Sequence, residues 1–433
     1  MNIHSLKLIT LALFAVTFLA AQPADDTVLK QVIIFGRHGV RSSSVPTEQL
    51  NTFSVLATPD FGNASGYVTT HGAADETIMG GYYRLWLTQE GLLTGNDSAD
   101  AAFVYIRANA AEVTTQPTAQ AFASGLLPAA SVNIYVYPQA NDPVIDPVPA
   151  GVALLDPQKA IAAVSGRLGG DPQLLSSAYA PEFALTRSLL FNYPASQTPP
   201  LATPTGKTDV TTLPIAITAG TGGSPIDVGG LEYVGASIDP FLMENADGLP
   251  VWGQLTPANI SQTYRIYTLI LDLEYRTPYL DQVQSSNVAS HIVRSLVQAA
   301  TGNAMTGALG NPSTKVVMLV ASDVNVTGLA GLFHLDWILP GYPPDFCAPS
   351  GTLAFELRQS QSTGEYTVRA SYRAQTLDQL RNQTPLTLDA PPAIAPLFIP
   401  GCSVDNATFD CPLGKFVRVA NQVIDPHSTD LVN

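Results

Sequence analysis

Basic residues and cysteines are scarce in this chain of 433 residues. It has 20 Lys and Arg against 35 Asp and Glu, a formal net charge of -15 and a pI of about 4.6. Such a chain has no basic surface for nucleic acid or for an anionic membrane, so we exclude both as partners. Its three cysteines and scattered histidines show no metal-ligand spacing, and we expect no metal site.

Long apolar runs are absent after the amino terminus, and no later run reaches the ~20 residues of a membrane span. Residues 1–21 place Lys7 before the apolar run Leu8–Ala21, which ends in small residues. This order is typical of a secretory signal peptide. We therefore predict a secreted protein that is not membrane-bound once the signal is removed; a membrane anchor is the alternative.

The most informative motif follows the apolar run Val32–Phe35, which is typical of a buried parallel strand. Arg37, His38 and Arg41 come directly after it. Ligands of open α/β sheets bind outside the carboxyl ends of such strands. Guanidinium groups match phosphate, and an imidazole between two cations stays neutral and can attack phosphorus. The motif indicates a phosphate site, although the same residues could simply pair with carboxylates in a loop.

This motif resembles the Arg-His-Gly-x-Arg-x-Pro signature of the histidine acid phosphatases, with Ser43 in place of the proline. Further segments are similar, in the same order, to the bacterial phytase and glucose-1-phosphatase branch of that family. They are Val68–Gly72, Gly80–Arg84, Glu90–Leu93, Ala121–Pro128, Thr384–Leu386 and Pro400–Leu413. Several ordered matches are far more specific than one motif.

The resemblance implies a phosphoglycerate-mutase-like α/β sandwich, with helices on both faces of a mostly parallel sheet and an inserted smaller helical cap domain. The sequence pattern agrees, because strand-like and helix-like segments alternate over 22–130 and again over 262–433. Between them, 131–261 includes stretches rich in Pro, Thr, Gly and Ser. We predict a discontinuous α/β domain over 22–130 and 262–433, and a cap domain over 131–261.

The resemblance also assigns roles in the site. His38 would be the nucleophile, Arg37 and Arg41 would bind phosphate, and Asp323 would protonate the leaving group, without a metal or an organic cofactor. Two positions depart from the family. Ser322 stands where the family has the histidine of a His-Asp motif, and Thr114 aligns with a family arginine.

Each missing charged hydrogen bond would remove roughly 1.5–3 kcal/mol, or about 10- to 100-fold in rate. Three hypotheses follow. The chain is a secreted hydrolase of phosphate monoesters that acts through a phosphohistidine in an altered pocket. Alternatively, it is a repurposed enzyme with His38 and Asp323 as acid and base, or a non-catalytic secreted ligand-binding relative. We favour the first, with a small phosphorylated substrate, because the acidic surface repels highly phosphorylated ones such as phytate.

Secretion bears on the cysteines and on glycosylation. The resemblance implies a disulfide between Cys402 and Cys411, which leaves Cys347 unpaired. Glycosylation sequons predict a glycoprotein if the host is a eukaryote; they lie at Asn63, Asn96, Asn259, Asn325, Asn382 and Asn406. Because Asn325 lies within the second motif, we expect it to be unmodified.

Overall fold

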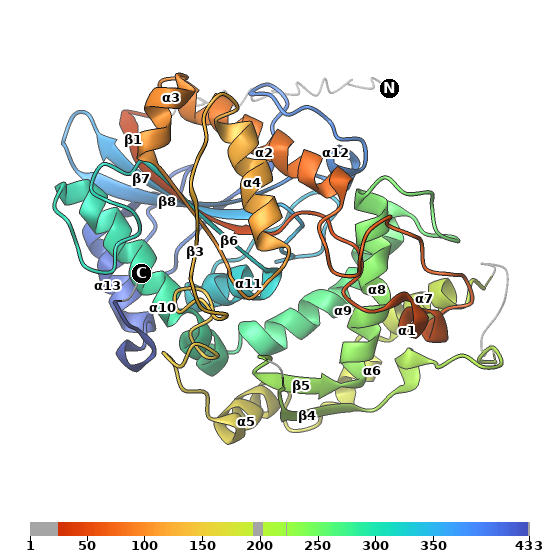
Figure 1. Cartoon of the computed structure of the whole chain (residues 1–433). Coiled ribbons are helices and arrows are strands. Elements are labelled where there is room, and N and C mark those ends of the chain that lie inside the picture. Colours follow the sequence, from red (N-terminus) through yellow and green to blue (C-terminus); the bar gives the residue numbers. More distant parts are fainter. Residues whose placement is uncertain (1–24, 194–201, 222, 432–433) are drawn as a thin grey trace, which may run out of the picture.

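The computed structural model describes residues 25–193, 202–221 and 223–431 (Figure 1). The predicted signal peptide, residues 1–21, lies outside the described residues. Within the described part of the chain, no helix is long and apolar enough to cross a membrane.

A central mixed sheet has the strand order β10-β8-β7-β1-β6-β2-β3, with β9 paired to β8. Strands β1, β6, β2 and β3 run parallel, whereas β7 to β10 pair in antiparallel fashion. The bounds are β1 (Thr27–Arg37), β2 (Val104–Ala108), β3 (Ile134–Val136), β6 (Val316–Ala321), β7 (Thr352–Ser360), β8 (Tyr366–Ala374), β9 (Ala393–Leu397) and β10 (Cys411–Pro412). The register pairs Arg37 with Ala321, so β1 and β6 end at the same edge of the sheet.

Helices cover both faces of this sheet (Figure 1). Along β1, Val32 and Ile34 belong to one core, and Ile33 and Phe35 belong to the other, as the alternation of a strand requires. Helices α2 (Thr70–Gln89) and α4 (Thr115–Leu126) cover the first face; α10 (Pro278–Thr301), α11 (Asp323–Leu332) and α13 (Leu413–Val423) cover the second. This confirms the predicted α/β fold with helices on both faces.

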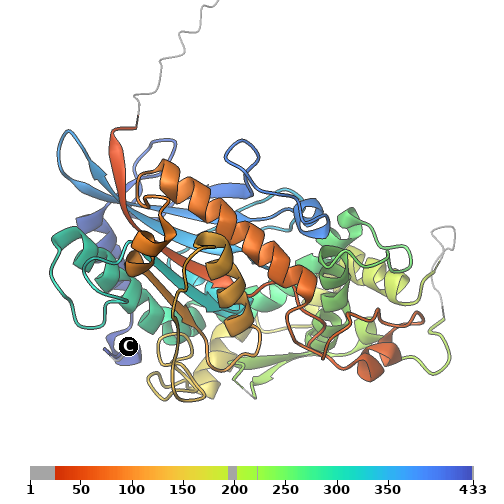
Figure 2. The same cartoon turned by 45° about the horizontal axis from the view of Figure 1, so that its top comes forward.

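A second lobe of helices and one hairpin lies beside one end of the sheet (Figure 2). It comprises α1 (Thr47–Phe53), α5 (Pro157–Arg167), α6 (Leu174–Ala178), α7 (Ala180–Leu190), β4 (Ile215–Ala219), β5 (Ile226–Gly229), α8 (Gly230–Ala246) and α9 (Pro257–Tyr275). The short helices α3 (Asp97–Asp100) and α12 (Leu377–Arg381) lie elsewhere. The cap domain over 131–261 stays a prediction; within that range, β3 pairs with β2 in the central sheet.

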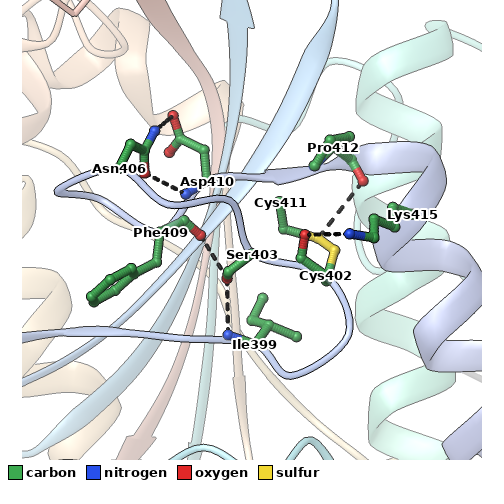
Figure 3. Close-up of a disulfide and its surroundings, with 9 residues drawn as sticks. All are labelled: Ile399, Cys402, Ser403, Asn406, Phe409, Asp410, Cys411, Pro412 and Lys415. Carbon is green, nitrogen blue, oxygen red and sulfur yellow. Dashed lines mark hydrogen bonds between the residues drawn. A yellow bond between two sulfur atoms is a disulfide. The ribbon is translucent and has the colours of Figure 1, made fainter.

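A disulfide joins Cys402 to Cys411, whose Cα atoms are 5.2 Å apart (Figure 3). The pairing implied by the resemblance is therefore confirmed. Inside the closed loop, the Ser403 hydroxyl donates to the Phe409 carbonyl at 2.7 Å. Closing so short a loop contributes on the order of 2–3 kcal/mol in the chain-entropy view. Cys347 is buried and forms no disulfide within the described part of the chain.

Candidate active site

His38 lies directly after β1, at the carboxyl edge of the parallel strands, and is 4% exposed. Its Nδ1 is 2.9 Å from the carbonyl oxygen of Gly39. A carbonyl oxygen can only accept, so Nδ1 carries the proton and donates it to this oxygen. The lone pair of the neutral ring is therefore on Nε2, which is the nitrogen available for attack.

The charge state of His38 follows from its surroundings. Burial, together with the neighbouring guanidinium groups of Arg37 and Arg41, lowers its pKa to about 3. The imidazole is thus neutral in mildly acidic solution. A neutral histidine beside two cations fits a nucleophile that meets an anion.

Arg37, the last residue of β1, is almost completely buried. One terminal nitrogen, Nη1, donates to the Cys347 carbonyl at 2.6 Å, and Nη2 lies 3.0 Å from Asp323 Oδ2. Among the described residues, its Nε has no hydrogen-bond partner. Because a buried donor without a partner is costly, this N–H is suited to a ligand oxygen.

Arg41 forms a bidentate pair with Asp239 of α8, at 2.9 Å and 3.1 Å. Both side chains are buried; burial by itself would lower the pKa of Arg41, but the pairing with Asp239 leaves this pKa above its usual value. Asp239 therefore occupies the two nitrogens that phosphate would use. A phosphate that binds Arg41 bidentately must displace this carboxylate.

Asp323 is the first residue of α11, and only Ser322 separates it from the end of β6. Its Oδ2 accepts a hydrogen bond from the Tyr267 hydroxyl at 2.9 Å and forms an ion pair with Arg37 Nη2 at 3.0 Å. Burial by itself would raise its pKa, but Arg37, His38 and Tyr267 together hold it below its usual value. Asp323 is therefore ionised while it is paired with Arg37.

Ser322 and Thr114 are the two remaining residues of the predicted site. The Ser322 hydroxyl donates to Asn325 Oδ1 at 2.8 Å, so its proton is already used within the first turn of α11. Thr114 lies at the start of α4 and is buried. Its Oγ1 has no partner within the described residues, and it is therefore available to a ligand.

Two backbone contacts fix the loop that carries His38. The Gly39 N–H donates to Thr118 Oγ1 at 3.0 Å, and Thr118 in turn donates to the Thr114 carbonyl at 2.8 Å. The Ser350 N–H donates to the His38 carbonyl at 3.1 Å. These bonds join α4 and the segment before β7 to the loop of His38, so the ring is positioned before a ligand arrives.

Glu112, two residues before Thr114, is a half-buried carboxyl near the same group. Burial, together with the charges of Asp146 and Asp323, raises its pKa to about 7, against a lowering by Ser322 and Arg41. It is therefore protonated in acidic solution, where it can donate a hydrogen bond.

Thus the structure brings together Arg37, His38, Arg41 and Asp323; Ser322 precedes Asp323 in the chain, and Thr114 is connected to the loop of His38 through Thr118. Sequence reasoning missed the carboxylate of Asp239, the hydroxyl of Tyr267, the positioning contact of Thr118, and Glu112. Glu112 had a signal in its closeness to Thr114 along the chain. Asp239 and Tyr267 had none, because their helices α8 and α9 are distant in sequence from β1.

Comparisons with known proteins extend over almost the whole chain. No family model matches it. It is 27% identical over 416 residues to phytase AppA of Escherichia coli, covering 94% of each chain. It is 26% identical to a glucose-1-phosphatase of Providencia rettgeri, covering 97% of this chain and 99% of that one. The solved structure of Hafnia alvei phytase in complex with tartrate matches with a TM-score of 0.83 and 28% identity, over 94% of this chain and 99% of that one.

Proposed function

We propose that this homologue of the histidine acid phosphatases, a phosphatase-type hydrolase, cleaves phosphate monoesters through a phosphohistidine at His38. The observation that carries the proposal is a neutral imidazole with Nε2 available, flanked by two buried arginines. The relatives are named as a phytase and a glucose-1-phosphatase, which both act on phosphate esters.

In the first step, His38 Nε2 attacks phosphorus, and the bond between phosphorus and the ester oxygen breaks. Asp323 gives a proton to the departing oxygen. It is ionised while paired with Arg37, but a phosphate that takes over Arg37 removes this stabilisation and adds negative charge nearby, and both changes raise its pKa. In the second step, water attacks the phosphohistidine, Asp323 takes a proton from it, and phosphate leaves.

The phosphate pocket is altered relative to the family pattern. Arg37 and Arg41 supply cations, whereas Thr114 supplies only a neutral hydroxyl group and the Ser322 hydroxyl donates to Asn325. We therefore expect transfer of the phosphoryl group to His38 to be slower than in a pocket that has a histidine and a third arginine at these two positions.

We also propose that the protein is secreted. The sequence pattern of residues 1–21 and the disulfide between Cys402 and Cys411 support export to an oxidising compartment. Asn325 donates from Nδ2 to the Ile145 carbonyl and to Asp146, both at 3.1 Å, so its amide is engaged and we expect no glycan there.

The test is release of phosphate from a panel of monoesters between pH 4 and 7 by the purified protein and by His38→Ala. His427→Ala is the matched control, because His427 is exposed and near the carboxyl end. We expect activity that His38→Ala abolishes and His427→Ala retains. Equal activity, or none, in all three proteins would overturn the proposal and favour a repurposed enzyme or a binding protein.

A further inference from the structure

Asp146 accepts hydrogen bonds from two side-chain amides that follow different strands of the central sheet. Its Oδ2 accepts from Asn109 Nδ2 at 2.7 Å, and its Oδ1 accepts from Asn325 Nδ2 at 3.1 Å. Asn109 comes directly after β2, and Asn325 lies in the first turn of α11, which follows β6. Asp146 therefore joins the carboxyl ends of β2 and β6 through side-chain contacts.

Asn325 connects Asp146 to the start of the helix that carries the proposed proton donor. Its Oδ1 accepts from the Ser322 hydroxyl at 2.8 Å and from the Ser322 N–H at 3.2 Å. Its Nδ2 donates to Asp146 and to the Ile145 carbonyl, at 3.1 Å each. Both polar atoms of this amide are therefore engaged. Asp323 is the first residue of the same turn, so the placement of its carboxyl group depends on these bonds.

The loop that carries Asp146 is anchored on two sides. Arg107 of β2 donates to Asp142 from Nε at 2.8 Å and from Nη2 at 2.7 Å, and both side chains are completely buried. The Asp146 N–H donates to the Asp142 carbonyl at 2.7 Å. From α10, Asn287 Nδ2 donates to the Pro143 carbonyl at 2.7 Å. A carboxylate on a loop fixed in this way can hold a neighbouring helix turn in place.

Asn109, the second partner of Asp146, is fixed as well. It is completely buried, and its N–H donates to the Val320 carbonyl of β6 at 3.0 Å. Its own carbonyl accepts from Thr115 Oγ1 of α4 at 2.6 Å. Movement of Asp146 toward or away from α11 would thus break its bond to a group that cannot follow.

We propose that Asp146 is a positioning residue for the proton donor Asp323, and that it acts through Asn325 and the first turn of α11. The inference rests on the proposed function, in which Asp323 gives its proton to the ester oxygen as the bond from phosphorus to that oxygen breaks. Such a transfer depends on geometry, because a misplacement of about 1 Å can cost about 100-fold in rate. A well-placed general acid contributes roughly 100- to 10,000-fold.

The choice of leaving group separates a positioning role from a merely structural one. Glycerol 2-phosphate releases a strongly basic alkoxide, which must be protonated as it departs. The phenolate that 4-nitrophenyl phosphate releases is weakly basic and departs without a proton. The ratio kcat/KM covers the steps up to departure of the leaving group, so it excludes the later attack of water on the phosphohistidine.

Asp146→Asn keeps the shape of the side chain but replaces an acceptor oxygen with a donor that faces another amide N–H. Asp146→Ala removes both acceptors without adding a donor, and it serves if Asp146→Asn does not fold. Asp100→Asn is the matched control. Asp100 is a buried carboxylate that also accepts from N–H groups, two from the backbone at 3.0 Å, but it precedes β2 and so lies toward the opposite edge of the sheet.

We expect Asp146→Asn to lower kcat/KM for glycerol 2-phosphate by about tenfold or more, and to lower it several-fold less for 4-nitrophenyl phosphate. Asp100→Asn should leave the ratio between the two substrates unchanged. Equal losses for both substrates in a folded Asp146 variant, or the same change of ratio in Asp100→Asn, would overturn the positioning role while phosphate release still depended on His38. Activity that survives in His38→Ala would instead refute the proposed function, and the positioning role with it.

Discussion

Replacing Ser322 by histidine tests how much a charged donor is worth in this pocket. In the structure, the Ser322 hydroxyl donates to Asn325 Oδ1 at 2.8 Å, and the Ser322 N–H donates to the same oxygen at 3.2 Å. The hydroxyl proton is thus directed into the helix. An imidazole in its place would leave the backbone hydrogen bond intact and could reach a phosphoryl oxygen. The neighbouring carboxylate of Asp323, whose pKa lies below its usual value, would favour its protonated form.

The expected increase in kcat of Ser322→His follows from one charge-assisted hydrogen bond, which contributes roughly 1.5–3 kcal/mol. If this bond forms in the transition state, kcat rises about 10- to 100-fold. Loss of serine at the start of α11 should cost about 0.5–2 kcal/mol of stability. The two effects are measured separately, by release of phosphate at pH 5 and by thermal unfolding.

Ser322→Asn is the matched control, because asparagine also favours helix starts but brings only a neutral donor. We expect Ser322→His to exceed both the unmodified protein and Ser322→Asn in kcat. A folded Ser322→His with unchanged or lower kcat would show that the missing charge does not limit the reaction, and the reasoning about the pocket would be wrong.

Three further predictions concern the carboxyls. Glu112, with a pKa of about 7, should make kcat/KM fall as the pH rises through 7, and Glu112→Gln should move this fall to higher pH in a pH–rate profile. Asp239→Asn should free Arg41 for phosphate and lower the inhibition constant of inorganic phosphate by about tenfold or more, whereas weaker inhibition would contradict the pairing. Burial raises the pKa of Glu76 to about 8, so the folded state keeps a proton that the unfolded state loses near pH 4.5. The free energy of unfolding should therefore fall as the pH rises from about 4.5 to about 8. Glu76→Gln should reduce the difference in unfolding temperature between pH 5 and pH 8.

The centre of the fold could be predicted because its signals are local. The run Val32–Phe35 has no polar residue, and neither has Val316–Ala321, as strands buried on both faces require. The rule that ligands bind at the carboxyl ends of such strands then predicts a site where both strands end. The structure brings Arg37 within 3.0 Å of Asp323 at that edge.

The partners of that site could not be predicted in the same way. Asp239 is separated from Arg41 by 198 residues, and its role depends on how α8 packs beside the loop after β1. Nothing in the residues around Asp239 distinguishes it from a surface carboxylate. The same holds for Tyr267, whose hydroxyl reaches Asp323 only because α9 runs along the site. Such contacts follow from tertiary packing, which no local pattern encodes.

The charges of the ligand-free site explain why acidic solution should favour its use. Arg37 is paired with Asp323, and Arg41 with Asp239, while His38 is neutral. The group is therefore close to electroneutral, and a phosphate that binds it brings charge that the two arginines cannot fully compensate. The displaced carboxylates must then turn towards water or take up protons. Protonation costs less free energy, because it removes the repulsion between the carboxylate and the phosphate. Binding coupled to proton uptake strengthens as the pH falls, and a protonated carboxyl left beside the ester oxygen is the acid that the first step needs.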